Sequence, residues 1–181
     1  EDLKGEKRPF SFTCLNEADT LEFIIKIYEE HDGVTEALFD HGPGDQLMLG
    51  DPFGAISYEG PGTFIAGGAG ITPFIAILRK LREDDALSGN SLHFANKTSK
   101  DIILHDELAT LLGPQAHFVL SQETAAGCRE GRIDQPYIRE HIADLNQHFY
   151  VCGPPPMVEN ITRVLALLGA DSDRVITEDG I

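Results

Sequence analysis

Two glycine-containing turns in this sequence could each face a phosphorylated ligand. The first, Gly67-Gly68-Ala69-Gly70-Ile71-Thr72-Pro73, follows the apolar run 63–66 and precedes a helical pattern. Missing side chains at Gly67, Gly68 and Gly70 would let a pyrophosphate approach the backbone, and amides at the helix start would face it with the positive end of the helix dipole. Pro73 suits a first helical turn, where its missing N–H is not needed. The pattern predicts a dinucleotide site.

The second turn, Cys152-Gly153-Pro154-Pro155-Pro156-Met157, follows the apolar run 149–151. Open parallel sheets bind ligands outside the carboxyl ends of their strands, so both turns should meet at that edge. We therefore expect a second phosphate-facing turn there. A lone cysteine is more often a buried small side chain, but beside such a turn Cys152 is a candidate functional group.

The elements that must position these turns alternate between strands and helices from residue 62 onward. Short apolar runs at 63–66, 92–95, 117–120, 149–151 and 175–177 predict five strands buried on both faces. Helical periodicity follows at 74–81, 105–112 and 157–168, with Gly169 as a left-handed cap, and Asp134 can cap a further helix running to about Ile142. Strands alternating with helices predict a five-stranded, parallel, doubly wound sheet.

The first third of the chain has a different pattern. Residues 21–28 alternate apolar with other side chains at the period of two typical of a half-buried strand, and shorter strands are predicted at 8–15 and 46–49. Turn residues at Glu59-Gly60-Pro61-Gly62 separate the two patterns. The sequence thus predicts a β domain over residues 1–60 and an α/β domain over residues 61–181.

Composition restricts the classes of partner and cofactor. A net charge of −16 disfavours nucleic acid and anionic membranes, and no apolar run approaches the roughly 20 residues that span a bilayer. Three cysteines, none in a Cys-x-x-Cys pair, cannot build a four-thiolate site, and the seven histidines have no metal-ligand spacing. We expect a cytoplasmic protein without a metal, whose redox chemistry would come from an organic cofactor.

Four motifs, in order, resemble those of the ferredoxin–NADP reductase superfamily of flavin-dependent reductases. Arg8-Pro9-Phe10-Ser11 resembles its Arg-x-Tyr-Ser flavin motif, and Gly33-Val34-Thr35 its second flavin phosphate turn. The two glycine turns described above resemble its nicotinamide motifs. The resemblance covers almost the whole chain. It implies that the β domain is part of an antiparallel flavin-binding barrel, with FAD, or alternatively FMN, as cofactor and NADH or NADPH as hydride donor.

The resemblance also implies roles for individual residues. Arg8 would bind the flavin phosphates, Phe10 would stack on the isoalloxazine ring, and Ser11 would hydrogen-bond near the nitrogen that accepts the hydride. Thr35 and the amides after Gly33 would hold phosphate at the start of a short helix, 34–39. Thr72 and Cys152 would flank the nicotinamide. The implied catalytic residues are Ser11, Cys152 and Glu178. The implied cofactor-binding residues are Arg8, Pro9, Phe10, Ser11, Lys26, Gly33, Val34, Thr35, Gly68, Ala69, Gly70, Ile71, Thr72, Pro73, Asn96, Lys97, Glu123, Cys152, Gly153, Pro154 and Met157.

Three features depart from the family pattern. Phe10 replaces the usual tyrosine, which keeps the ring and removes the hydroxyl. The strands that normally precede the first flavin motif are absent, so we expect a fragment lacking roughly fifty residues of the barrel. The sequence ends at Asp179-Gly180-Ile181, without the aromatic residue that some relatives place over the flavin.

The choice of hydride donor depends on the residues after the second and third strands. Phosphate-selective relatives carry Ser-Arg where this chain has Ser121-Gln122-Glu123. Glu123 would repel a 2′-phosphate and could accept a hydrogen bond from a ribose hydroxyl, which favours NADH, whereas Lys97 favours NADPH.

The predicted function is hydride transfer from NAD(P)H to a bound flavin and electron transfer onward to an unidentified small molecule or redox protein. The acidic surface disfavours an acidic ferredoxin as that acceptor. One alternative is a nucleotide-binding electron-transfer or regulatory subunit that is active only within a complex. Another is an ordinary dehydrogenase, although no histidine or Tyr–Lys pair is placed to act as its acid–base group.

Overall fold

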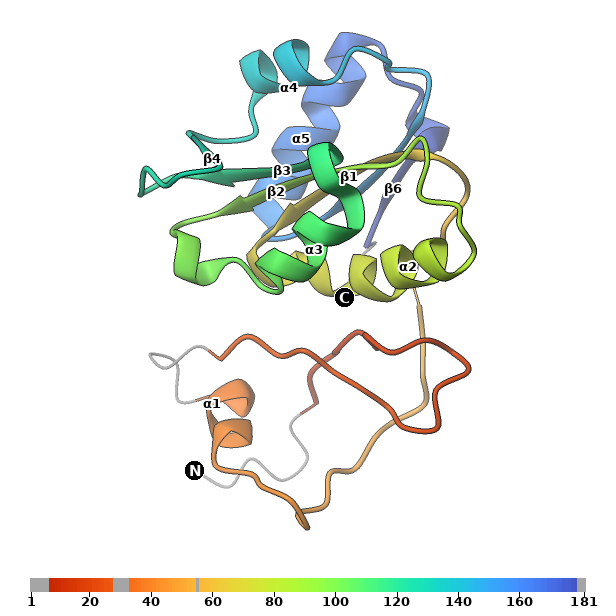
Figure 1. Ribbon diagram of the computed structural model, residues 1–181, viewed down its shortest axis with the longest axis vertical. Coiled ribbons are helices and arrows are strands. Elements are labelled where there is room, and N and C mark those ends of the chain that lie inside the picture. Colours follow the sequence, from red (N-terminus) through yellow and green to blue (C-terminus); the bar gives the residue numbers. More distant parts are fainter. Residues whose placement is uncertain (1–6, 28–32, 55, 179–181) are drawn as a thin grey trace.

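The computed structural model describes residues 7–27, 33–54 and 56–178 (Figure 1). Its centre is a six-stranded sheet of order β4-β3-β2-β1-β5-β6, with every neighbouring pair parallel. The strands are β1 (Gly62–Gly67), β2 (Ser91–Asn96), β3 (Ala116–Leu120), β4 (Cys128–Glu130), β5 (His148–Cys152) and β6 (Val175–Thr177). Chain order reverses between β1 and β5, which marks the switch point where such sheets bind ligands.

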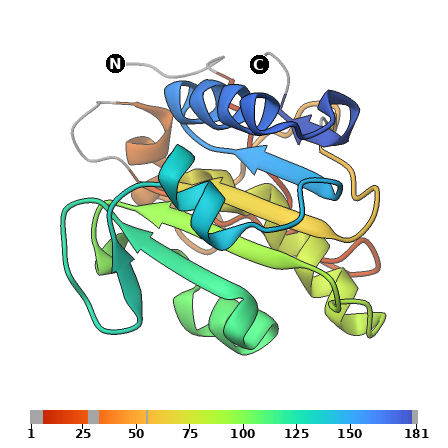
Figure 2. The ribbon, with the colours of Figure 1, turned by 90° about the horizontal axis from the view of Figure 1, so that it is seen from above.

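Helices cover both faces of the sheet (Figures 1 and 2). Helices α2 (Thr72–Glu83) and α3 (His105–Leu112) pack on one face, and α4 (Gln135–His141) and α5 (Pro155–Leu168) on the other. Short 3₁₀ turns lie at η1 (Gly68–Ile71), η2 (Ser99–Asp101), η3 (Gly113–Gln115) and η4 (Ser172–Arg174). The predicted doubly wound architecture is confirmed.

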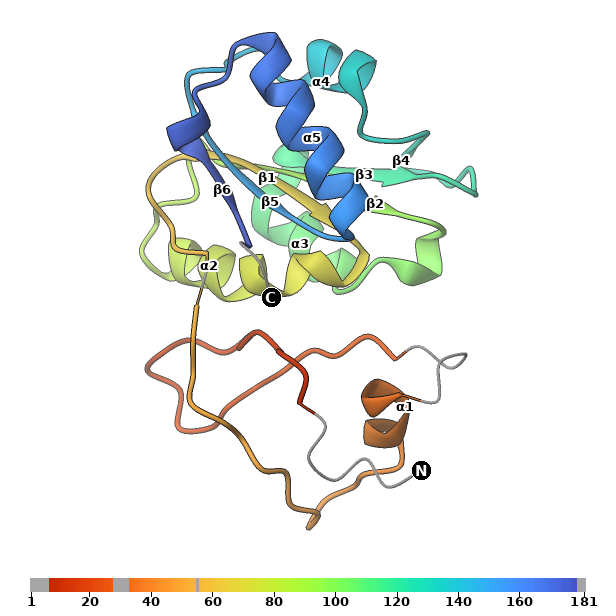
Figure 3. The same cartoon turned by 180° about the vertical axis from the view of Figure 1, so that it is seen from behind.

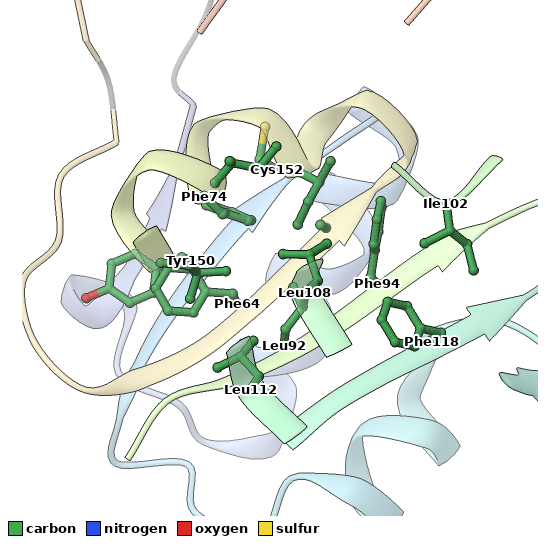
Figure 4. Close-up of a cluster of buried hydrophobic side chains, with 14 of the residues drawn as sticks. Phe64, Phe74, Leu92, Phe94, Ile102, Leu108, Leu112, Phe118, Tyr150 and Cys152 are labelled. Atoms are coloured by element: carbon green, nitrogen blue, oxygen red, sulfur yellow. The ribbon is translucent and has the colours of Figure 1, made fainter. Parts of the chain in front are cut away.

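Two apolar clusters, one on each face, make up the core. The first contains Phe64, Phe94 and Tyr150 from the strands and Phe74 and Leu108 from α2 and α3, as Figure 4 shows. The second packs Ile65, Phe149 and Val151 against α4 and α5. All six residues of β1 are buried. Burial on both faces explains why these strands read as continuous apolar runs rather than as alternating patterns.

The helix signals in the sequence are confirmed. The Asp134 side chain caps α4 by accepting a hydrogen bond from the Tyr137 amide at 3.0 Å. Gly169 ends α5 at φ +97°, a backbone conformation that favours glycine. The helix α1 (Val34–Phe39) has the predicted bounds.

The sheet has one strand more than predicted. Strand β4 is only three residues long, and Arg129 and Glu130 in it are exposed. A short edge strand with polar side chains carries neither an apolar run nor a clear alternation, so periodicity gives no signal for it.

The predicted strands of the first third are not regular strands among the described residues. Segments 8–15 and 21–27 share a single antiparallel bridge, Phe12↔Phe23, and the chain around Met48 has no regular structure and no strand partner among the described residues. Met48 is 98% exposed. A strand needs a partner to form a ladder, and no segment described in the structure pairs with 46–49. Residue 28, the end of the predicted second strand, lies outside the described residues.

The described part of the N-terminal segment, residues 7–27, 33–54 and 56–60, lies against the sheet face that α2 and α3 cover (Figures 1 and 3). Where this segment enters β1, the Tyr150 hydroxyl accepts hydrogen bonds from the Glu59 and Gly60 amides and donates one to the Gly60 carbonyl. The division into two domains near residue 60 stays a prediction. Among the described residues, no helix is long and apolar enough to cross a membrane.

Candidate functional site

The two glycine turns touch each other at the carboxyl edge of the sheet. Ala66 and Cys152 are register partners in β1 and β5, so the turns that follow them begin side by side. A Cβ added at Gly70 would overlap the carbonyl oxygen of Cys152, and one at Gly153 would lie 3.1 Å from the Gly67 backbone. Glycine is therefore required at Gly70 because the two backbones pack directly, and the expectation that the turns meet is confirmed.

Gly68 differs from its neighbours because it borders open space. Its φ is +53°, and a Cβ added there would meet no atom within 4 Å. It begins the turn η1, which continues into α2 with Pro73 in the first helical turn. A helix start with open space beside a glycine can receive an anion close to the backbone. Residues 68–73 thus have a backbone geometry that could receive an anion, and their role in binding phosphate stays a prediction.

The second turn has fewer free amides than the first, and its role toward phosphate stays a prediction. Pro154, Pro155 and Pro156 have no N–H, and the amides of Met157 and Val158 both donate to the Pro154 carbonyl. The start of α5 therefore has few donors to offer an anion. This turn instead places Cys152 beside the first turn, with Met157 packed near Gly67.

Cys152 and Glu178 form a hydrogen-bonded pair at the ends of β5 and β6. The thiol is 4% exposed, and its Sγ donates to Glu178 Oε2 at 3.3 Å. Burial and the adjacent carboxylate together raise the pKa of the Cys152 thiol to about 12. The thiol is therefore neutral at physiological pH, so it acts as a hydrogen-bond donor and a packing surface rather than as a nucleophile.

Two further predicted residues lie next to the first turn. The Thr72 hydroxyl donates to the Ala69 carbonyl at 3.0 Å. Asn96, at the end of β2, is 7% exposed, and neither polar atom of its side chain has a hydrogen-bond partner. Leaving a buried amide unpaired costs about 1–3 kcal/mol. A polar group held at that cost beside a cradle is a reason to expect a ligand or water there.

Glu123 is engaged with the loop after β2. Its carboxylate accepts from the Ser99 amide at 2.6 Å and from the Ser99 hydroxyl at 3.0 Å. Lys97 is exposed in the same loop. The structure thus brings together the two residues whose opposite charges were predicted to influence donor choice.

The residues predicted to hold flavin lie in the N-terminal segment. Arg8 and Pro9 are exposed, with Arg8 Nη1 donating to the Lys7 carbonyl, and Phe10 and Ser11 are half-buried. Gly33, Val34 and Thr35 begin α1, without a side-chain cap. Their roles toward flavin stay predictions.

Lys26 contacts the α/β part of the chain. Its ammonium lies 2.9 Å from Asp101 Oδ1, and this contact lowers the pKa of Asp101. Its predicted role at a cofactor is not shown by this contact, which instead attaches the N-terminal segment to η2.

Comparison with known proteins agrees with this geometry. The family model described as "Oxidoreductase NAD-binding domain" matches residues 64–163, more than half of the chain. The chain belongs to this family.

Curated relatives of this NAD-binding domain extend the match to the N-terminal segment. NADH-cytochrome b5 reductase 1 of Eremothecium gossypii is 27% identical over 99% of this chain and 68% of its own length. The reductase component of propane 2-monooxygenase from Mycolicibacterium smegmatis is 29% identical over 85% of this chain and 49% of its own length. The chain therefore spans about half of the latter protein.

Solved structures show the same fold. The cytochrome b5 reductase domain of Ulva prolifera nitrate reductase superposes with a TM-score of 0.76, at 24% identity, over 94% of this chain and 78% of that one. A ferredoxin NADP+ reductase from Neisseria gonorrhoeae gives a TM-score of 0.70 at 20% identity. With the family match and the curated relatives, these place the NAD-binding domain in the ferredoxin–NADP reductase superfamily.

Sequence reasoning missed the residue that joins the N-terminal segment to this domain. Arg79 on α2 bonds Thr13 and Glu22, 66 and 57 residues away in the chain. An arginine beside the apolar stripe of a helix normally predicts only a solvated edge, so no local pattern identified it.

One cavity among the described residues lies away from the glycine turns. It has a volume of about 540 Å³ and lies at the amino ends of β1 and β2, lined by residues that include Thr63, Ser91 and His141. No glycine turn borders it at a strand's carboxyl end. The glycine turns lie instead at the carboxyl edge of the sheet, where open parallel sheets bind their ligands.

Proposed function

We propose that this chain binds NADH or NADPH at the carboxyl edge of its sheet and passes the hydride to a flavin held by the N-terminal segment. The observation that carries this proposal is the packing of the two glycine turns, with the neutral Cys152 thiol and Glu178 beside the open cradle at Gly68. Nothing in an ordinary tight turn requires this combination.

The residues present fit a dinucleotide. Open space at Gly68 leaves room for pyrophosphate against the backbone, and Asn96, whose amide is unpaired, directly follows Ala95, the register partner of Gly67. Thr72 and Cys152 would flank the nicotinamide. A nicotinamide ring supplies a hydride when it is bound, and the chain's part is to bind and orient the ring and to exclude water around it.

Cys152 would orient the ring without exchanging protons. Its thiol, buried and hydrogen-bonded to Glu178, stays protonated across physiological pH. A small neutral group lets a planar ring approach closely, and Glu178 fixes the direction of the thiol hydrogen.

The position of the predicted flavin contacts in the chain supports the proposal. Phe10 and Ser11 precede the fully buried Thr13, whose carbonyl is bound by Arg79 of α2. The predicted flavin segment is therefore attached to the helix that starts at the nucleotide turn. FAD is proposed as the flavin, with FMN as the alternative.

NADH is proposed as the preferred donor. The Glu123 carboxylate is fixed by Ser99 near the end of β3 and would repel a 2′-phosphate, although Lys97 in the same loop would attract one. A small molecule or a non-acidic redox protein is proposed as the acceptor, since a net charge of −16 repels acidic partners. Composition supports a cytoplasmic location.

The test is NADH oxidation by the purified chain with added FAD and an artificial dye as acceptor. Flavin-dependent dye reduction is expected, with no turnover when either NADH or flavin is omitted. If isothermal titration calorimetry shows that NADH binds but no dye is reduced, the proposed activity is wrong. The alternative of a nucleotide-binding subunit that works only within a complex would then be favoured.

A further inference from the structure

Arg79 connects three parts of the molecule through one guanidinium group. Its Nε and Nη2 donate to the two carboxylate oxygens of Glu107 on α3, at 2.6 and 3.0 Å. Its Nη1 donates to the Thr13 carbonyl at 2.7 Å and to Glu22 Oε1 at 2.6 Å. The Glu22 carboxylate also accepts from the Thr13 hydroxyl at 2.8 Å. The guanidinium thus contacts α3 and both arms of the N-terminal hairpin, which are the segments 8–15 and 21–27 joined by the Phe12↔Phe23 bridge.

The same hairpin arm makes two more contacts with the NAD-binding domain. Ile24 packs against the core cluster that includes α2 and α3, and Lys26 pairs with Asp101 of η2. Alternate residues of an extended segment share one face. Glu22, Ile24 and Lys26 therefore form a docking face, in which Arg79 fixes one end.

Both chain segments that Arg79 joins lead directly to the proposed cofactor sites. Helix α2 continues from the turn Gly68–Ile71, which forms the proposed pyrophosphate cradle. The hairpin continues backward from Thr13 to Ser11 and Phe10, the proposed flavin contacts. Only Phe12 lies between Ser11 and Thr13, so a shift of the hairpin moves these contacts with it.

We propose that Arg79 is a positioning residue for hydride transfer: it fixes the distance between the flavin-binding segment and the helix that carries the nicotinamide cradle. This inference rests on the proposed function. Arg79 touches neither cofactor site directly. It acts through the Thr13 carbonyl and the Glu22 carboxylate. The planar guanidinium can donate to these two groups and to Glu107 at the same time because its N–H donors point in several fixed directions.

Hydride transfer is sensitive to such positioning. Reacting atoms must approach to about 3–3.5 Å, and a misplacement of about 1 Å can lower the rate about a hundredfold. Nucleotide binding depends on the cradle itself and should change little. Loss of Arg79 should therefore lower the rate of hydride transfer without weakening the binding of NADH.

The experiment compares Arg79→Gln and Arg79→Lys with the matched control Arg82→Ala, an exposed arginine three residues further along α2. Protein reconstituted with FAD is mixed anaerobically with NADH. We record the rate of flavin bleaching, the dissociation constant of NADH, and the long-wavelength charge-transfer absorbance of stacked nicotinamide and flavin. We expect about a tenfold to hundredfold slower bleaching and a weakened charge-transfer band in Arg79→Gln. Partial recovery is expected in Arg79→Lys and wild-type values in Arg82→Ala.

Unchanged bleaching and charge-transfer absorbance in a folded Arg79→Gln would overturn the positioning role while leaving the proposed function intact. Equal losses in all variants and in NADH affinity would assign Arg79 a merely structural role. If Arg79 variants do not fold, Glu22→Ala, which removes the Glu22 acceptor and leaves the Arg79–Glu107 pair in place, carries the test, and a wild-type rate there overturns the inference. A wild-type protein that binds NADH and FAD but never bleaches would refute the proposed function itself.

Discussion

The Cys152 thiol lies 3.3 Å from the carboxylate of Glu178, although the two residues are 26 positions apart in the chain. Register explains this proximity, because Val151 and Thr177 are partners in the parallel pair β5–β6 and the next residue of each strand follows at the same edge. Glu178 is exposed whereas Cys152 is buried. The pair therefore joins the interior of the site to its surface, next to the two glycine turns.

Replacement of Cys152 by alanine should slow hydride transfer more than it weakens nucleotide binding. The alanine removes the thiol donor and leaves a small gap beside the proposed nicotinamide position, so the ring loses a constraint on its orientation. We expect the single-turnover rate to fall roughly tenfold or more, with the dissociation constant of NADH nearly unchanged. Equal losses in rate and affinity would contradict the orienting role.

The hydride-transfer rate should show no step from ionisation of this thiol between pH 6 and about pH 10. The pKa of Cys152 is raised to about 12, so the protonated form persists over that range. Stopped-flow flavin reduction across this range tests the point, with Cys152→Ala as the matched control. A step near pH 8 that disappears in the alanine variant would show that the thiol ionises in the working range.

Alanine at Gly70 and at Gly68 should have opposite consequences. At Gly70 the added methyl would overlap the Cys152 backbone, so Gly70→Ala should lower the free energy of unfolding by about 3 kcal/mol or more. At Gly68 the methyl enters open space at positive φ, so the cost to folding should be about 1 kcal/mol. Gly68→Ala should instead raise the NADH dissociation constant, because the methyl occupies the proposed pyrophosphate path. Denaturant unfolding and NADH titration of both variants distinguish the two roles, and unchanged NADH affinity in Gly68→Ala would place the pyrophosphate elsewhere.

Glu123→Gln should shift donor preference toward NADPH. The change removes a negative charge while an amide can still bond to Ser99, so loop structure should be retained. A charge effect of about 1 kcal/mol corresponds to roughly a fivefold change in the ratio of kcat/KM for NADPH and NADH. Glu130→Gln, a change at an exposed glutamate of β4, is the control and should leave the ratio unaltered. No shift in Glu123→Gln would remove this residue from the specificity site.

His93 should make the fold sensitive to acid. The side chain is 1% exposed, its Nδ1 lies 2.8 Å from the Tyr137 hydroxyl, and its ring stacks on His117. Burial, together with neighbouring His117 and His141, lowers the pKa of His93 from 6.5 to about 3. Below about pH 6.5 the unfolded chain binds a proton that the folded chain does not, so stability falls as the pH decreases toward 3.

The measurement is the free energy of unfolding from pH 7 to pH 4 for wild type, His93→Gln and the exposed control His41→Gln. His93→Gln should reduce the slope by up to about 1.4 kcal/mol per pH unit. His41→Gln should leave the slope unchanged. Identical slopes in all three proteins would show that His93 takes up its proton in the folded state.

The sheet and its helices were predictable because their signals are local. Apolar runs, a capping Asp134 and the terminating Gly169 each act within a few residues, and the bounds of α1 and α3 agree with the prediction. The meeting of the glycine turns was also predictable, since it follows from parallel strand topology alone.

Other features depend on contacts that no local pattern reveals. Arg79 binds partners more than fifty residues away, and Glu123 bonds to Ser99 across two loops. The three consecutive prolines at 154–156 carry a signal of their own, since their missing N–H groups reduce the number of donors at the start of α5. His93 lies inside β2 in the core, a position that its polar side chain does not predict.

Anaerobic single-turnover reduction of FAD-reconstituted protein by NADH tests the central claim most directly. NADH deuterated at the transferred position serves as the comparison. Transfer of a hydride across a site built by the two glycine turns predicts rapid loss of the visible flavin absorbance and a primary isotope effect on its rate. Flavin that stays oxidised while NADH is bound would contradict the account.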